Sequence, residues 1–289
     1  MAIRLRPVTP DDAEPCGRII HEAFKDIAAR HNFPPDFPSV DFAIEFAHLF
    51  INNPSIFGVV AEESDGRVVG SNFLTEWDSI RAVGPITVAP NAQGQQTGRR
   101  LMQAVIERGK EAEGIRLVQD SFNLASLSLY ASLGFEVKEP LVIIEGAIKE
   151  AHAKGFEVRP LLDSDVEACA ELCRKVTGIE RTNELNSLRY NFKPFVALRG
   201  GRVTAYGSSL FFWPLNHAVA ETEEDMQALL AGASAANTTE PLSFILATRQ
   251  AKLFRWCLKM GMRAVKPLTL MAMGQYQEPR GCYLPSVGY

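Results

Sequence analysis

The sequence predicts an α/β protein of two similar domains, each a mixed twisted sheet flanked by helices. Two observations predict the duplication: residues 3–19 resemble residues 156–172, and residues 133–141 resemble residues 260–268. A third observation predicts the fold class. Short apolar segments alternate with amphipathic ones, and residues 84–121 show a strand–loop–helix–strand order, which is typical of sheets covered by helices.

The first similarity has a constant offset of 153 residues. "IRLRPVTPDDAEPCGRI" aligns with "FEVRPLLDSDVEACAEL", and the identical pairs are Arg6 and Arg159, Pro7 and Pro160, Asp12 and Asp165, Glu14 and Glu167, and Cys16 and Cys169. Both segments predict a short strand, an Asp-rich turn that can start a helix, and an amphipathic helix.

The second similarity has an offset of 127 residues. "LGFEVKEPL" aligns with "MGMRAVKPL", so the second copy is shorter by 26 residues in between. Two matches in the same order favour two domains of common ancestry over chance. We therefore predict domains at 1–148 and 149–289, joined near residues 147–155.

Hydrophobic periodicity and turn signals predict the elements of the first copy. We expect strands at 2–7, 56–62, 68–76, 84–88, 116–121 and 135–144, and helices at 11–30, 40–51, 98–112 and 123–133. Gly114 is expected to stop the third helix.

Composition excludes several classes of protein. The 289 residues carry a net charge of −4, with 30 basic and 34 acidic side chains, so no overall basic field indicates nucleic acid. No apolar run reaches the roughly 20 residues of a membrane helix, and the N-terminus lacks a signal-peptide pattern. We expect a cytoplasmic protein with no membrane partner.

The five cysteines do not suggest a disulfide framework, because their number is odd. Cys169 and Cys173 lie four residues apart, on one face of a predicted helix, with no histidine nearby in sequence. We expect them to be core thiols rather than metal ligands, and we expect no metal site.

The segment "VAPNAQGQQTGRRLM", residues 88–102, leads from a strand through a glycine-bearing turn into a helix. Such a junction suits an anion, because the free N–H groups and the dipole of the helix point at the ligand. From these residues alone, an ordinary turn is as good an interpretation.

Together with "NLASLSLYASLGFE", residues 123–136, this segment resembles the GNAT superfamily of acyl-CoA-dependent N-acyltransferases. The resemblance extends over residues 1 to about 146. The first motif is matched by Val88, Pro90, Gln93, Gln96 and Gly98, and the second by Asn123, Ser126, Leu129, Tyr130, Leu133, Gly134 and Phe135.

The resemblance implies transfer of an acetyl group from acetyl-CoA to a primary amine by direct attack. It implies that the loop cradles the CoA pyrophosphate and that the strand ending at Val88 splays from its neighbour to pair with the pantetheine arm. Tyr130 is then the general acid for the leaving thiolate, although a purely packing tyrosine is the alternative. The implied cofactor-binding residues are Ile86, Thr87, Val88, Gln93, Gly94, Gln95, Gln96, Thr97, Gly98, Arg99, Asn123, Ser126 and Tyr130.

Two departures from the family pattern stand out. Gln96 replaces the first loop glycine, and its Cβ requires a negative φ or costs strain. The strand before the loop lacks the glutamate that many members use as a base, so Glu76 and Asp78 are the candidates, with surface acids as the alternative. These departures motivate a second hypothesis, a catalytically inactive tandem protein that binds or senses acyl-CoA or another small molecule.

The second copy resembles the degenerate C-terminal GNAT-like domain of some two-domain bacterial acetyltransferases. Its counterpart of the loop, residues 216–233, has no Gly-x-Gly, and a capping box from Thr222 to Asp225 predicts a helix start with three acids that repel phosphate. Cys257 takes the place of Tyr130 and is expected to be a small buried residue.

The acceptor side of the first copy is expected to involve residues 29–42, either as a partly apolar lid or as an ordinary loop. We expect a small-molecule amine rather than a protein as acceptor, no nucleic acid, and a monomer or homodimer.

Overall fold

The computed structural model describes residues 3–94, 96–148 and 155–288. It is an α/β structure that divides into two compact units. The first unit comprises Met1–Leu117 and Phe122–Glu136, and the second comprises Val118–Ser121 and Val137–Tyr289.

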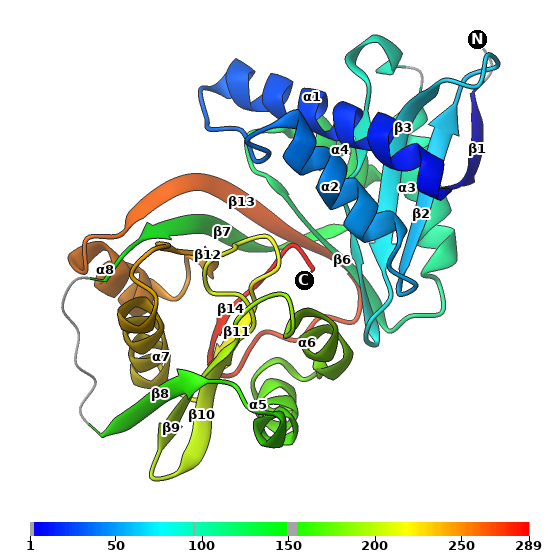
Figure 1. Ribbon diagram of the computed structural model, residues 1–289. Helices are drawn as coiled ribbons and strands as arrows, with labels where there is room; N and C mark the ends of the chain where they lie inside the picture. The colour runs from blue at the N-terminus through cyan, green and yellow to red at the C-terminus, as the bar shows by residue number, and fades with distance from the viewer. Residues whose placement is uncertain (1–2, 95, 149–154, 289) are drawn as a thin grey trace. The chain divides into compact units, whose positions relative to one another are not determined.

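The first unit is a mixed sheet between two layers of helices (Figure 1). Its strands lie in the order β1 (Arg4–Pro7), β2 (Ile56–Glu62), β3 (Val68–Thr75), β4 (Ile80–Val83) and β6 (Gly114–Asp120), and β5 (Thr87–Val88) also pairs with β3. The β4–β6 pair is parallel and the others are antiparallel. The helices are α1 (Ala13–His31), α2 (Val40–Ile51), α3 (Thr97–Arg108) and α4 (Leu124–Ser132).

Successive residues of β3 show how the helices cover this sheet. The ring of Phe73 meets Phe50 of α2 edge-on, with centroids 5.7 Å apart. The neighbouring Asn72 donates from Nδ2 to the carbonyl of Leu101 in α3, at 3.3 Å. Because neighbouring side chains of a strand point to opposite faces, α2 and α3 lie on opposite faces of the sheet.

Two expectations for this unit need correction. Helix α3 ends at Arg108, its C-cap is Gly109, and Gly114 begins β6 rather than stopping the helix. Glycine is a weak helix former, and Gly109 precedes Gly114, so the helix already stops at Gly109. The strand expected at 84–88 is regular only at Thr87–Val88, and the short strand β4 precedes it. The sequence of β4, IRAV, ends in two apolar residues and shows no strict alternation that would predict a strand.

The second unit contains a five-stranded antiparallel sheet, which also lies between two layers of helices. Its order is β14 (Cys282–Leu284), β11 (Ala218–Ala220), β10 (Arg202–Gly207), β9 (Phe195–Arg199) and β8 (Phe156–Pro160). The helices are α5 (Val166–Thr177), α6 (Thr182–Leu188), α7 (Glu223–Ala236) and α8 (Ala251–Lys259).

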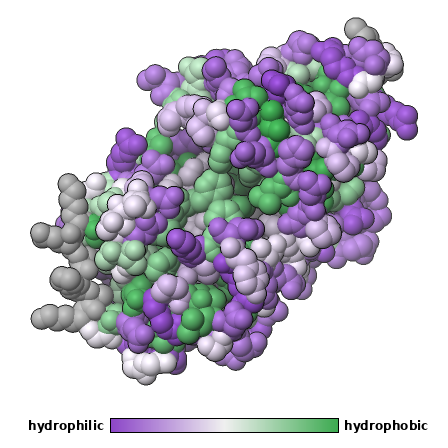
Figure 2. Space-filling model, viewed as in Figure 1, coloured by the Kyte–Doolittle hydropathy of each residue, from purple (hydrophilic) through white to green (hydrophobic). Residues whose placement is uncertain are grey.

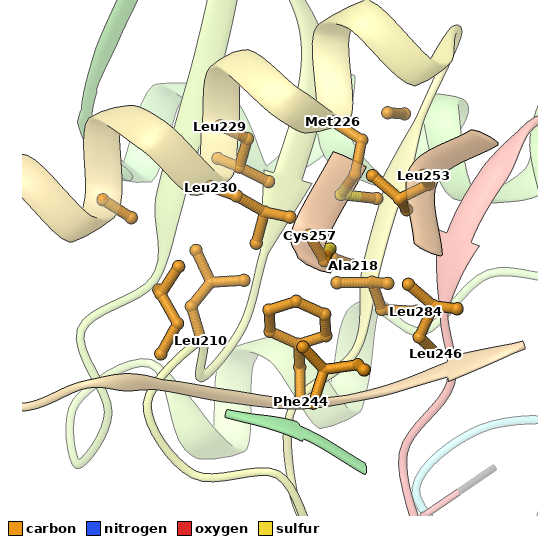
Figure 3. Packing of buried hydrophobic residues seen from close by; sticks show 14 of the residues in the cluster. Leu210, Ala218, Met226, Leu229, Leu230, Phe244, Leu246, Leu253, Cys257 and Leu284 are labelled. Carbon is orange, nitrogen blue, oxygen red and sulfur yellow. The ribbon is translucent and has the colours of Figure 1, made fainter. Parts of the chain in front are cut away.

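Each face of this sheet has its own apolar core. Ala197 and Ala205 belong to the core that includes residues of α7 and α8, and Val196 and Tyr206 belong to the core that includes residues of α5. Figure 3 shows part of the first core, in which Met226, Leu229 and Leu230 of α7 approach Phe244 and Leu210. The all-apolar interiors of β9 and β11 therefore reflect burial on both faces.

The last strands of the two sequence copies are exchanged. With the offset of 127, β6 corresponds to β12 (Leu242–Ala247), and β7 (Glu136–Gly146) corresponds to β13 (Arg263–Gly274). The observed strand order is β6, β13, β7, β12, so β6 pairs with the last strand of the other copy, and so does β12. Equivalent bonds hold the exchange: the amide of Ser121 donates to the carbonyl of Pro267 at 3.2 Å, and that of Thr248 donates to Pro140 at 3.0 Å.

The five cysteines are all buried free thiols. Cys169 and Cys173 lie in the core beneath α5, as expected, and burial raises the pKa of both. The face shown in Figure 2 carries mostly hydrophilic side chains over its protruding parts. No helix within the described ranges is both long and apolar enough to span a membrane.

Candidate functional site: the loop before α3

The predicted cofactor loop is a tight connection between β5 and α3. After Val88 the chain makes a 3₁₀ turn at Pro90–Ala92, then passes Gly94 at a φ of 84° and Gln96 at a φ of 60°. Gln95 lies outside the described residues. Gln93 donates from Nε2 to the carbonyl of Val88 at 3.2 Å, so the loop folds back on the strand that precedes it.

Gln96 adopts the left-handed conformation that a glycine would take without strain. The sequence allowed either a negative φ or a strained positive φ for this residue, and the structure has the strained positive φ. Gln96 is the N-cap residue of α3, its carbonyl accepts the amide of Arg100 at 3.0 Å, and its side chain makes no capping bond. The amides of the first turn have no partner within the helix, by helix geometry, and can serve an anion.

The start of α3 packs between β5 and α4. A Cβ built on Gly98 would lie 3.6 Å from Cδ2 of Leu129 and 3.9 Å from Cγ2 of Val88, so an alanine would also fit. Arg99 donates to Oγ of Ser132, at the end of α4, at 2.6 Å. The structure thus brings the two sequence motifs together around the first turn of α3. Thr97 is buried there, and Gln93 and Gly94 are exposed.

The strand before the loop keeps one edge without a strand partner. Val88 pairs with Gly70 and Thr87 with Ser71, both in β3. Neighbouring β6 pairs with β4 through Ile80–Ala82, upstream of the loop. Among the described residues, β5 pairs with no strand other than β3. The half-buried Ile86 and Val88 therefore lie along a strand edge that has no strand partner next to the helix start, and the Gln93 side chain bonds to the Val88 carbonyl.

The second motif forms α4 and its ends. Oδ1 of Asn123 accepts the amide of Ser126 at 3.2 Å and caps the helix. Tyr130 is buried, with 6% of its surface exposed, and its ring meets Phe135 at a centroid distance of 6.4 Å. Gly134 has a φ of 100°, which turns the chain so that the Phe135 amide reaches the Tyr130 carbonyl at 3.1 Å.

The two candidate bases lie at the other end of this sheet. Glu76 forms a bidentate ion pair with Arg108, the last residue of α3, at 3.0 and 2.9 Å. A helix of 12 residues separates that end from the loop by about 16 Å. Asp78 lies in the turn before β4, where its carbonyl accepts from Arg81. The structure does not bring Glu76 or Asp78 to the loop.

The connection between α1 and α2 lies against the segment that leads into α4. The rings of Phe33 and Phe122 stack at 4.5 Å, and the ring of His31 lies 4.9 Å from that of Phe122. Nδ1 of His31 lies 3.0 Å from the carbonyl of Ile27. A carbonyl only accepts, so Nδ1 is the donor in this contact, and Nε2 is the ring nitrogen left for an acceptor role. The sequence indicated this connection but not these two aromatic contacts, which join residues about 90 positions apart.

The corresponding site of the second copy has different chemistry. Thr222 caps α7 as expected and accepts the amide of Asp225 at 3.2 Å. The carboxylate of Asp225 is fully buried at this helix start, where Arg199 approaches it at 3.3 Å. Cys257 is buried, as expected, and desolvation raises the pKa of its thiol to about 12, which keeps it protonated and a poor nucleophile. Within the described part of the chain, no group of three or more His, Cys, Asp or Glu side chains could hold a metal ion.

Comparisons with known proteins agree with this arrangement. The family model "Acetyltransferase (GNAT) family" matches residues 22–135. A putative acetyltransferase from Pyrococcus horikoshii has a similar structure, with a TM-score of 0.74 and 18% identity over 96% of this chain and 91% of that one. A GCN5-related N-acetyltransferase from Sphaerobacter thermophilus has a TM-score of 0.64 and 14% identity over 96% of each chain.

A tandem GNAT protein from the clavulanic acid biosynthesis pathway has a TM-score of 0.61 and 14% identity, over 96% of this chain and 100% of that one. No curated protein matches this chain in sequence. These structural similarities cover both sequence copies and confirm the expected tandem GNAT fold.

Proposed function

We propose that the first copy of this chain, whose residues 22–135 match the family model "Acetyltransferase (GNAT) family", transfers an acetyl group from acetyl-CoA to a primary amine. The observation that supports this most is the junction of β5 and α3. There an unpaired strand edge, a tight loop and the amides of a helix start adjoin one another, and each suits a different part of CoA.

The pyrophosphate of CoA would bind the amides from Gln93 to Gly98, with the cation of Arg99 at the same helix start. The pantetheine arm would pair with the free edge of β5, from Ile86 to Val88, because its two amide groups can bond to a strand as a peptide does. Asn123, Ser126 and Tyr130 would line the thioester end.

The reaction is a direct acyl transfer. The amine nitrogen attacks the thioester carbonyl, the C–N bond forms, the C–S bond breaks, and the sulfur leaves as a thiolate. The hydroxyl of Tyr130 donates a proton to that sulfur, and the attacking nitrogen loses one. Holding both reactants in one geometry supplies much of the rate enhancement.

We assign the proton-accepting role to His31 rather than to Glu76 or Asp78. Nε2 of His31 is available as an acceptor, and its ring lies against Phe122, the residue before Asn123. His31→Gln should lower kcat about 10²-fold and leave the Kd for CoA nearly unchanged. His48→Gln, at the end of α2, is the matched control and should keep the wild-type kcat. An unchanged kcat in His31→Gln would remove His31 from the mechanism.

Tyr130→Phe tests the acid role. Thiol release from acetyl-CoA with a panel of small primary amines should fall by about 10²-fold or more, while calorimetry should give a nearly unchanged Kd for CoA. Tyr190→Phe, at an exposed position of the second unit, should behave as wild type. An unchanged turnover in Tyr130→Phe would leave this tyrosine a packing residue.

The same thiol-release assay distinguishes an active acetyltransferase from an inactive protein that only binds or senses acyl-CoA. Steady thiol release excludes the inactive acyl-CoA-binding alternative, whereas tight CoA binding without release for any amine or peptide acceptor would favour it. Absence of CoA binding at millimolar concentration would refute both.

A further inference from the structure

The second copy has a strand where the first copy has an open edge. β11 precedes α7 as β5 precedes α3, and β11 pairs with β10 as β5 pairs with β3. The other edge of β11 is occupied by β14, the last strand of the chain, with Ala218 opposite Leu284 and Ala220 opposite Cys282. β14 also contacts β12, the counterpart of β6.

The side chain of Gln250 bonds to the edge of β14 that faces away from β11. Nε2 of Gln250 donates to the carbonyl of Tyr283 at 2.6 Å, and the amide of Tyr283 donates to Oε1 of Gln250 at 3.0 Å. The N–H and C=O of one strand residue point to the same side, so this peptide faces away from β11 while its neighbours face it. The backbone of the tail is therefore paired on both edges.

Gln250 occupies the position in the second copy that corresponds to Asn123 in the first copy. Gln250 follows Asn123 by 127 residues, and both are N-cap residues with similar backbone angles, φ −76° and ψ 60° against φ −85° and ψ 78°. The residue that would lie beside pantetheine in the first copy thus binds a peptide of the tail in the second.

We infer that the C-terminal strand Cys282–Leu284 fills the pantetheine groove of the second copy and closes that copy to acyl-CoA. The inference rests on the proposed role of the first-copy groove. A pantetheine arm and an extended peptide both present amides along a strand edge, so they compete for the same backbone groups.

The residues around the filled groove favour the tail over CoA. The start of α7 carries Glu223 and Glu224, whose negative charges repel a pyrophosphate. Beyond β14, Oγ of Ser286 accepts from the buried Arg181 at 2.8 Å, which anchors the tail a second time. Residues 282–286 are buried, and a buried strand with several polar anchors opens rarely.

The test combines stoichiometry with amide hydrogen exchange on the full chain, using coenzyme A as the probe. Native mass spectrometry should show one CoA per chain. Exchange at residues 282–284 and 218–220 should be slow and should not change when CoA saturates the protein. A second bound CoA, or faster exchange of 282–284 on adding CoA, would overturn the inference.

Two matched variants separate this inference from the proposed function. Gln250→Leu removes both bonds to Tyr283 and should speed exchange at 282–284 at least tenfold, with β9 unchanged as the folding control and CoA affinity unchanged. Asn123→Leu should weaken CoA binding and leave the tail protected. Absence of CoA binding to the wild type would refute the proposed function. If residues 282–284 of Gln250→Leu exchange as slowly as in the wild type, the Gln250 side chain does not hold the C-terminal strand and the inference fails.

Discussion

Gln96 keeps the backbone path of the loop at a cost in conformational free energy. It stands where the family has glycine, and it takes a φ of 60°, which is glycine's own region. A residue with a Cβ pays roughly 1–2 kcal/mol for that conformation. The loop therefore keeps the path that presents its amides, although the sequence alone allowed a different path with negative φ.

Replacing Gln96 tests this strain directly. Gln96→Gly should be more stable than Gln96→Ala by about 1 kcal/mol in urea unfolding, because only alanine keeps the penalty of the left-handed region. Gln103 is the control, because it is exposed in the middle of α3, where alanine should exceed glycine by about 1 kcal/mol. If the two Gln96 variants are equally stable, or if alanine is more stable than glycine at position 96 as expected at position 103, the loop relaxes and the strain is absent.

At the scale of elements, the two copies repeat one arrangement at the start of their first helices, which we call the Arg–Asp clasp: an arginine and a backbone amide bond to the same aspartate. Arg6 donates twice to Asp12, at 2.7 and 2.8 Å, and Arg159 donates twice to Asp165, at 2.6 and 3.0 Å. The amide of Thr9 bonds to Asp12 at 2.7 Å, and that of Leu162 bonds to Asp165 at 2.8 Å. Identical bonds at the 153-residue offset support the duplication independently of the overall fold.

The Arg–Asp clasp predicts a stability loss in acid. Burial raises the pKa of Asp12, but hydrogen bonds from Arg6 and Thr9 outweigh it and lower the pKa. The hydrogen bond from Arg159 lowers the pKa of Asp165 against the smaller effect of burial. Because both folded pKa values are depressed, the contribution is present above the unfolded value of about 3.9 and is lost as pH falls through the folded values.

Asp12→Asn and Asp165→Asn should each lose about 2 kcal/mol of unfolding free energy at pH 7. Their difference from wild type should shrink as the pH falls below about 4, measured by urea unfolding at several pH values. Asp11→Asn, at the exposed neighbour, should change stability little at either pH. A difference that stays constant down to pH 2 would contradict the ionic origin of the effect.

At the scale of the whole molecule, the exchange of last strands makes each copy depend on the other. The strand order is β6, β13, β7, β12, so cutting the chain between the predicted domains takes β13 from β6 and β7 from β12, and it leaves β7 and β13 without either neighbour. Unpaired strand edges promote association.

The fragment 1–148 expressed alone should therefore form dimers or aggregates, and co-expression with 149–289 should restore a 1:1 complex. Size-exclusion chromatography with light scattering measures both outcomes. The intact chain, handled identically, is the control. A stable monomeric 1–148 with native-like exchange protection in β6 would show that the exchanged pairing is dispensable.

The sequence by itself determined the helices and most strands of the first copy, the duplication and the two motifs, because these depend on local period, caps and spacing. Helix 40–51 and strand 56–62 match the structure at both ends, since each has a clear apolar pattern between polar stops. Only the tertiary structure decided what depends on long-range pairing. It separated Glu76 from the loop, set His31 against Phe122, exchanged β7 and β13, and laid the tail on β11. Contacts between residues far apart in the sequence leave no local period, so no local pattern could have predicted them.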